Sequence, residues 1–144
     1  MPEHTTAAQR KRSVIERARG CCEYCRSQTR FSTQSFSIEH IVPRSHKGKD
    51  SADNLALACQ GCNNHKYTRI SSQDPVTGEI VPLYHPRQQK WNEHFTWNED
   101  FCQIIGLTPT GRATVQALQL NRAGLVNLRR VLYATGEHPP EEGN

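Results

Sequence analysis

Four cysteines in two short pairs have the spacing of a metal site. Cys22 and Cys25 form one Cys-x-x-Cys pair, and Cys59 and Cys62 form a second one further along the chain. In an intracellular protein, two such pairs are typical of a tetrahedral zinc site. Disulfides would require an exported protein, and a thioredoxin-like redox site needs one pair inside a βαβ pattern, which is absent. The spacing therefore predicts a structural zinc ion on these cysteines.

A second group of polar residues lies between and just after the cysteine pairs. Glu39 and His40 are neighbours, Asn54 follows a polar loop, and Asn63 comes directly after the second pair. An imidazole changes its charge near neutral pH, which suits His40 to the role of general base. A carboxylate and an amide oxygen are ligands for Mg²⁺ or Mn²⁺ rather than for zinc. This composition is typical of metal-assisted hydrolysis.

Taken together, these motifs resemble those of the HNH endonucleases. The family pattern is (Asp/Glu)-His-Ile-x-Pro, a loop with glycine, Asn-Leu, and Cys-x-x-Cys-(His/Asn)-x-x-Lys, and its matches lie within residues 13–70. The resemblance implies hydrolysis of DNA phosphodiester bonds on a ββα-metal fold, with His40 as general base. It also implies one divalent cation on Glu39 and Asn63, and an Asn54 side chain that bonds across the loop to aim His40. Asn63 stands where the family often has histidine.

Two further expectations concern the helix after the second cysteine pair and the class of protein. Residues three apart share a helix face, so Lys66 should lie near Asn63, while His65 lies about 200° around the helix and should face away. The rival interpretation is a zinc-knuckle module that binds nucleic acid or protein without cleaving it. Such a module needs neither Glu39 nor His40, and both are present. We therefore expect an enzyme.

Positive charge is concentrated in the first half of the chain. Residues 1–70 carry twelve Lys and Arg against six Asp and Glu, whereas residues 71–144 carry six against eight, which accounts for the net charge of +4. On charge alone a solvated face is the alternative, but a basic half that also contains the motif suggests DNA as the partner. We expect backbone phosphates to contact the N-terminal basic helix and four residues that flank the motif: Arg44, Lys47, Lys66 and Arg69.

The composition limits how the chain can be stabilised. With 144 residues it can form one compact domain, or a small domain with an extension, but only 35% of its residues are hydrophobic. A core this thin usually needs additional support, which a metal can supply. No uncharged run is long enough to span a membrane and no apolar signal segment opens the chain, so we expect a cytoplasmic protein without a membrane partner.

The elements that must position these residues predict an α+β fold. We expect an HNH core with a structural four-cysteine zinc site, preceded by a helix and followed by a small α/β extension. The expected segments are a basic helix (1–20), the HNH core with its zinc knuckles (21–70), an extension packed on the core (71–138) and a disordered tail (139–144). Hydrophobic spacing predicts helices over 5–19, 60–70, 111–120 and 123–135, and strands over 31–42 and 80–83.

Overall fold

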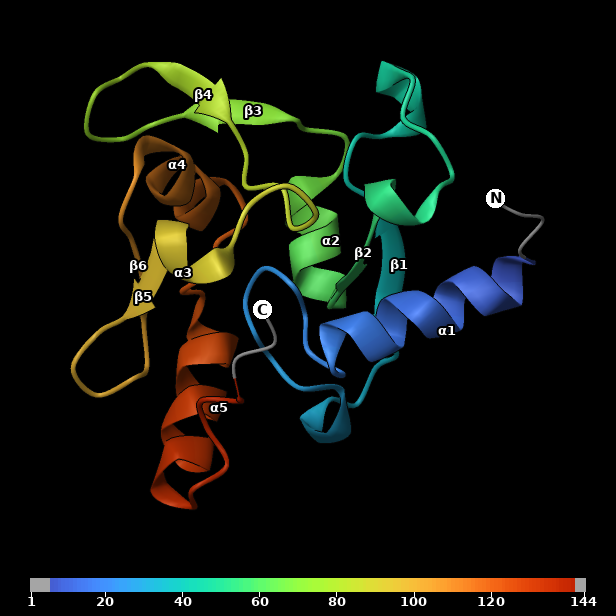
Figure 1. Cartoon of the computed structure of the whole chain (residues 1–144). Coiled ribbons are helices and arrows are strands. Elements are labelled where there is room, and N and C mark those ends of the chain that lie inside the picture. Colours follow the sequence, from blue (N-terminus) through green and yellow to red (C-terminus); the bar gives the residue numbers. More distant parts are fainter. Residues whose placement is uncertain (1–5, 142–144) are drawn as a thin grey trace.

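Helices and three small antiparallel hairpins make up the computed structural model, which describes residues 6–141 (Figure 1). The helices are α1 (Ala7–Ala18), α2 (Gln60–Lys66), α3 (Trp91–His94), α4 (Pro109–Ala117) and α5 (Ala123–Ala134). Consecutive strands pair with each other: β1 (Ser37–His40) with β2 (Leu55–Ala58), β3 (Ser71–Gln73) with β4 (Ile80–Pro82), and β5 (Phe95–Trp97) with β6 (Ile104–Gly106). This mixture of helices and small sheets confirms the predicted α+β class. Among the described residues, no helix has the length and apolar character needed to cross a bilayer.

The first helix forms where the sequence predicts it. Thr6 caps α1, because its hydroxyl accepts the backbone N–H of Gln9 while the Gln9 side chain bonds back to the Thr6 backbone. The alternative cap, Thr5, lies outside the described residues. The helix ends at Ala18 because Arg19 and Gly20 both have positive φ values, 54° and 71°. These residues set both ends of α1, and its apolar residues pack against the β1–β2 hairpin.

The β1–β2 hairpin has two different faces. Side chains alternate along a strand, so Leu55 packs against Val14 of α1 on one face. On the other face, Glu39 pairs in register with the small Ala56, and this face lies against α2 and the cysteines. The hairpin therefore lies between α1 and α2, and neighbouring residues of β1 serve opposite sides of it.

Two predicted elements are shorter in the structure than in the sequence analysis. The strand expected over 31–42 is confined to β1, and the helix expected over 60–70 ends at Lys66. Tyr67 terminates that helix, because its φ of 51° and ψ of −123° are not helical. The chain then turns into β3, and Arg69 lies in the connecting turn rather than on a helix.

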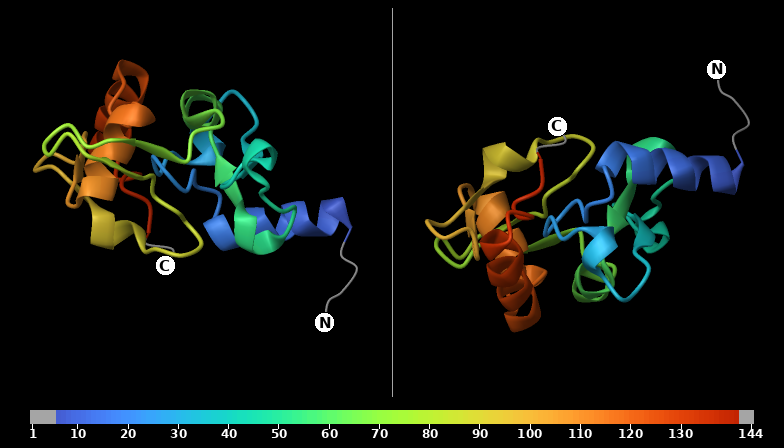
Figure 2. Two further views of the ribbon diagram at one scale, coloured as in Figure 1. Left: turned by 90° about the horizontal axis from the view of Figure 1, so that it is seen from above. Right: turned by 90° about the horizontal axis from the view of Figure 1, so that it is seen from below.

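The elements from β3 to α5 gather on the side of α2 that faces away from α1 (Figures 1 and 2). Their aromatic residues share one core with the cysteine region: Trp91 and Phe95 pack in the same cluster as Tyr24. The Trp91 indole N–H donates a hydrogen bond to the Tyr24 carbonyl at 2.9 Å. The aromatic-rich stretch around 91–105 therefore packs as expected, although its β5–β6 hairpin was not predicted from the sequence.

Arg129 fixes α5 to this core through hydrogen bonds to three backbone carbonyls. Arg129 is only 4% exposed and donates to the carbonyls of Leu120 (2.8 Å), Cys102 (3.1 Å) and Cys25 (3.4 Å). These bonds connect the last helix to the loop of the first cysteine pair. The described residues extend to Glu141. The tail expected to be disordered was 139–144, and its residues 142–144 lie outside the described residues.

Asp74 connects the β3–β4 hairpin to α4. Its two carboxylate oxygens accept hydrogen bonds from Nε and Nη2 of Arg112, both at 2.9 Å, and the Thr77 hydroxyl donates to it as well. The Arg112 guanidinium holds the pKa of Asp74 well below its usual range. A carboxyl group whose pKa is lower in the folded state stabilises the fold above its unfolded pKa, about 3.9, and this stabilisation is lost as the pH falls below that value.

We therefore predict that Asp74→Asn lowers the melting temperature at pH 7, and that the difference from wild type shrinks below about pH 4. Thermal unfolding followed by circular dichroism at pH 7 and pH 3 measures both. Glu79→Gln is the matched control, because Glu79 is an exposed carboxylate on the same hairpin. A loss of stability of equal size at both pH values would contradict the role of the Asp74 charge.

Candidate functional site

The four cysteines predicted to bind zinc lie together in the interior. Their sulfur atoms are all within 4.8 Å of one another, and the Sγ atoms of Cys25 and Cys59 are 3.6 Å apart. Four sulfurs bound to one zinc ion at about 2.3 Å would lie about 3.8 Å from each other. Cys59 is the N-cap of α2 and its sulfur accepts the backbone N–H of Cys62 at 3.4 Å. The cluster therefore fits a structural zinc ion.

A guanidinium that the sequence analysis did not single out lies against this cluster. Arg122 approaches Cys59 Sγ with Nη2 at 3.3 Å and Cys62 Sγ with Nη1 at 3.6 Å. Burial alone lowers the pKa of Arg122, but the neighbouring cysteine sulfurs outweigh that effect and the net shift is upward. Gly61 leaves room for this approach, because a Cβ there would lie 2.3 Å from Arg122 Nη2. This positive charge would offset the negative charge of four thiolates when zinc is bound.

Glu39 belongs to a buried network rather than to an open site. Glu39 is 6% exposed and Lys66 only 1%, and Lys66 Nζ lies 3.2 Å from Glu39 Oε1. The Tyr24 hydroxyl donates to Oε2, and Lys66 also donates to the Ile41 carbonyl at 2.8 Å. Burial raises the pKa of Glu39, while Lys66 and Tyr24 act in the opposite direction. The expected phosphate contact of Lys66 is therefore wrong: it lies on the buried side of α2, where its ammonium compensates Glu39.

This network does not suit a catalytic cation on Glu39. A Mg²⁺ ion needs oxygen ligands at about 2.1 Å, and at Glu39 Oε1 it would stand beside the Lys66 ammonium. Asn63 is half-buried on α2, and its amide makes no side-chain hydrogen bond within residues 6–141. The register of β1 is regular, so Glu39 and His40 point to opposite faces of the hairpin. In this arrangement Glu39 and Asn63 do not form a site for Mg²⁺ or Mn²⁺.

His40 lies on the α1 side of the hairpin and has a partner that the sequence analysis missed. Its Nε2 is 2.7 Å from Oδ1 of Asp50, and Arg44 Nε donates to the same oxygen at 3.1 Å. The hydrogen bond with His40, and then the one from Arg44, lowers the pKa of Asp50 below its usual range. Asp50 therefore stays ionised at neutral pH. The only sequence signal for it was a carboxylate in the polar loop that follows the histidine.

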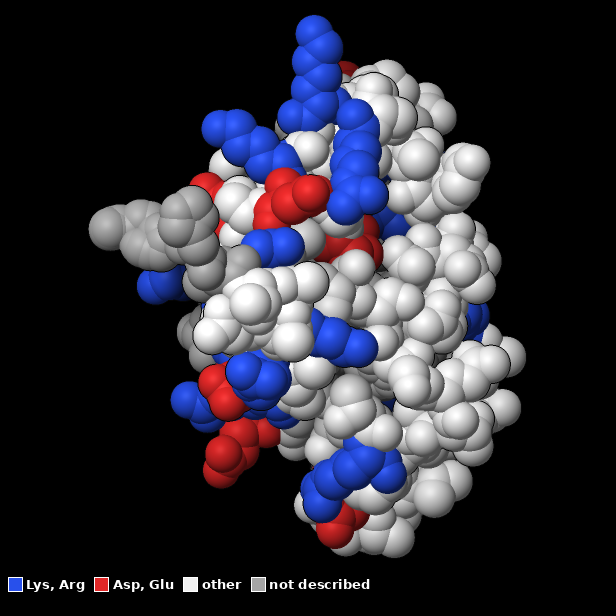
Figure 3. All heavy atoms as spheres, turned by 90° about the vertical axis from the view of Figure 1, so that its right-hand side faces the viewer, with Lys and Arg blue, Asp and Glu red and all other residues white. Residues whose placement is uncertain are grey.

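His40 and Asp50 line a hollow of about 220 Å³ whose other lining residues are three apolar ones (Ala7, Ile38 and Leu55) and three basic ones. Arg44 lines it from the same loop, and Arg10 and Lys11 line it from α1. Lys and Arg side chains also project from the face of the molecule that holds α1 and this loop (Figure 3). With three basic residues and one carboxylate around the histidine, the hollow suits an anionic group such as a phosphate.

Asn54 bonds across the loop that leads away from His40, as the resemblance implied. Its Oδ1 accepts the backbone N–H of Val42 at 2.8 Å, and its Nδ2 donates to the carbonyls of Val42 (2.9 Å) and Lys49 (2.8 Å). The backbone carbonyl of Asn54 also accepts from Ile41 N–H at 2.9 Å. These bonds hold the ends of the loop beside the hairpin, directly after His40. Gly48 makes the closure possible, because a Cβ there would lie 1.6 Å from the Val42 carbonyl oxygen.

The structure places the remaining site residues on the surface. Arg44, Lys47 and Arg69 are all exposed, in positions where a phosphate backbone can reach them. His65 is exposed on α2, whereas Asn63 is partly covered, which agrees with the expectation that the two residues face different directions.

The cysteine cluster predicts a defined metal content. Protein purified without added metal should contain about one zinc ion per chain by elemental analysis, because four buried thiolates form a closed tetrahedral site. A chain in which Cys62 is replaced by serine should lose the ion and unfold at lower temperature. A fully folded wild-type sample without metal would contradict this prediction.

The loop closure predicts that alanine substitutions at two glycines differ sharply in their effect on stability. Gly48→Ala should destabilise the protein by about 1–3 kcal/mol, because the new methyl group meets the Val42 carbonyl and forces the loop to move. Gly124→Ala is the control, since nothing lies within 4 Å of a Cβ at that helical position. Urea unfolding compares the two variants. Equal stability of both would show that the loop does not need the close approach.

Comparison with known proteins adds one finding to this geometry. Residues 22–69 match the family model described as HNH endonuclease, and this range includes both cysteine pairs, His40 and Asn54. No curated protein and no solved structure matches the chain. The part of the chain that holds the cysteine cluster and His40 therefore matches an HNH endonuclease domain.

Proposed function

We propose that this protein hydrolyses phosphodiester bonds of DNA, with His40 as the general base and Asp50 as the residue that orients it. The observation that carries the proposal is the 2.7 Å contact between His40 Nε2 and Asp50, in a hollow that three basic residues also line, within the part of the chain that matches an HNH endonuclease domain. A histidine oriented by a carboxylate is an arrangement suited to proton abstraction from water.

The contact with Asp50 defines which imidazole nitrogen can act as the base. Because Asp50 is ionised, it accepts a hydrogen bond, and we assign the proton of neutral His40 to Nε2. Nδ1 then carries the lone pair, and it has no hydrogen-bond partner within residues 6–141. A water molecule next to Nδ1 transfers its proton there while its oxygen attacks phosphorus. The bond from phosphorus to the leaving oxygen breaks, and that oxygen takes up a proton from solvent water. Family precedent gives 5′-phosphate and 3′-hydroxyl ends.

The basic residues around His40 supply the charge that this reaction needs. Arg10, Lys11 and Arg44 face the hollow and are placed to neutralise the phosphate as negative charge builds up on its oxygens. Lys47 and Arg69 are exposed further out and fit contacts with the DNA backbone. Such contacts give affinity without reading the base sequence.

A divalent cation is the usual cofactor of HNH nucleases and supplies further neutralisation of charge when it is bound. The proton transfer proposed for His40 does not depend on a cation at Glu39, which is already compensated by Lys66. The rival function is a module that binds nucleic acid without cleaving it. A module that only binds nucleic acid does not need a histidine paired with a carboxylate. His40 and Asp50 form such a pair in the hollow, which favours the enzyme.

Single-turnover cleavage of an end-labelled DNA duplex, with Mg²⁺ or Mn²⁺ supplied, tests the proposal. His40→Ala should slow cleavage by about 10²–10⁴-fold, the usual contribution of a general base. Asp50→Asn should slow it less, because the imidazole remains but is no longer held in one orientation. His65→Ala is the control, since His65 is exposed on α2 and takes no part in the hollow.

DNA binding, followed by fluorescence anisotropy, should survive His40→Ala because the phosphate contacts of the basic residues are unchanged. Cleavage by His40→Ala at the wild-type rate would remove His40 from the mechanism. Binding of DNA by the wild-type protein without any cleavage would favour the rival module.

A further inference from the structure

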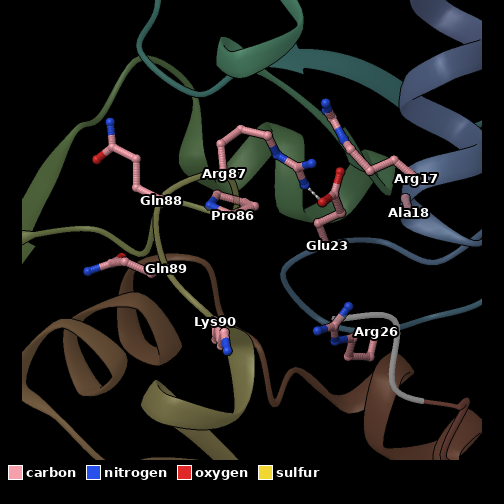
Figure 4. A pocket seen from close by; sticks show the side chains of 9 residues that line it. All are labelled: Arg17, Ala18, Glu23, Arg26, Pro86, Arg87, Gln88, Gln89 and Lys90. Atoms are coloured by element: carbon pink, nitrogen blue, oxygen red, sulfur yellow. Dashed lines mark ion pairs between the residues drawn. The ribbon is translucent and has the colours of Figure 1, made fainter.

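A second hollow, separate from that of His40, lies where three segments of the chain meet (Figure 4). It has a volume of about 300 Å³ and lies between the C-terminal end of α1, the loop of the first cysteine pair and the segment that leads into α3. Arg17 comes from α1, Glu23 and Arg26 come from the loop, and Arg87 and Lys90 come from the third segment. The size suits a phosphate group with part of its attached sugar.

The charge of this hollow is strongly positive. Four basic side chains line it, against one carboxylate. That carboxylate is already engaged: Glu23 Oε1 is paired with Arg87, as Figure 4 shows, and Oε2 accepts the backbone N–H of Leu57 at 2.9 Å. Within the described residues, neither Arg17 nor Lys90 has a carboxylate partner. The residues that line the hollow therefore include three more basic than acidic side chains.

Two guanidinium groups meet here without enough acceptors. The Nε atoms of Arg17 and Arg87 are buried and have no hydrogen-bond partner. Arg17 uses its terminal nitrogens to bond the carbonyls of Ala52 (3.0 Å) and Leu55 (2.7 Å). Burial, and then repulsion from Arg17, lowers the pKa of Arg87 to about 10. An anion in the hollow would relieve that repulsion and add acceptor oxygens. Arg26 is held at the wall of the hollow by the ring of Trp91, 4.9 Å away.

The position of the hollow relative to His40 suggests which anion it takes. Arg10, beside His40, and Arg17, in this hollow, are seven residues apart on α1. They therefore lie on one side of the helix and about 10 Å apart along its axis. Measured along the axis of a DNA duplex, that distance corresponds to an advance of about three nucleotides of one strand, at about 3.4 Å each. A strand that follows α1 from His40 brings another of its phosphates to this hollow.

We propose that the hollow formed by Arg17, Arg26, Arg87 and Lys90 binds a backbone phosphate of the same DNA strand whose other phosphate lies at His40. The source of the phosphate rests on the proposed function, whereas the site itself rests on the charge and geometry of the hollow. The site positions the strand, and none of its residues touches the reacting phosphate.

Salt-dependent DNA binding by the full chain tests this site. The parent protein carries His40→Ala, so that binding is measured without cleavage, and Lys90→Gln and Arg26→Gln are added to it one at a time. Each substitution should reduce the slope of log K against log salt by about 0.9, the value for one lost phosphate contact. If variant and parent bind equally at 1 M salt, the variant should then bind roughly eightfold more weakly than the parent at 0.1 M salt. Arg130→Gln is the control, because it removes the same charge from an exposed position on α5.

Arg87 is not substituted, because its loss would leave the Glu23 carboxylate buried and unpaired. Circular dichroism of each variant shows whether it folds, and Lys90 is exposed and has no side-chain hydrogen bond within residues 6–141, so its substitution leaves the core intact. If both variants match Arg130→Gln in affinity and slope, the site is refuted. Cleavage of DNA by the wild-type protein tests the proposed function separately. If binding depends on Lys90 and Arg26 but the wild-type protein cuts no DNA, the site is supported and the hydrolase is refuted.

Discussion

Four cysteine sulfurs within 4.8 Å of one another connect parts of this chain that a thin hydrophobic core would hold only weakly. Cys59 and Cys62 follow β2 and begin α2, so the cluster fixes the hairpin and the helix to the loop of Cys22 and Cys25. Arg122 lies on the cluster and Arg129 bonds the Cys25 carbonyl, which brings the C-terminal helix to the same point. Zinc at this site would therefore contribute to folding of both halves of the molecule.

Because side chains alternate along β1, Glu39 packs in the interior, whereas His40 is available for the proposed reaction. Glu39 turns toward α2, where Lys66 and Tyr24 hold it in the interior. His40, the next residue, turns toward α1 and meets Asp50 in a hollow open to solvent. A shift of one residue in the pairing of β1 with β2 would exchange these two environments. The cysteine cluster and the bonds of Asn54 keep that register, and the proposed reactivity of His40 depends on it.

Features marked by a short motif or by the family resemblance were predictable from the sequence, and side-chain partners on other elements were not. The Thr6 cap and the two Cys-x-x-Cys pairs are short motifs, and the loop bonds of Asn54 were implied by the resemblance to the HNH endonucleases. The burial of Lys66 depends on Glu39, which lies on another element, and pattern alone placed that lysine at the surface. Arg122 and Asp50 were missed for the same reason, since an arginine or aspartate in a polar stretch carries no sign of its distant partner.

Hydrogen exchange measured along the whole chain, with zinc bound and after chelation, tests most directly whether the cysteine cluster connects the two halves. The account predicts that removal of zinc speeds exchange both in β2 and in the segment 118–129, which contacts the cluster through Arg122 and Arg129. Faster exchange confined to the two cysteine pairs themselves, with β2 and 118–129 still protected, would contradict it.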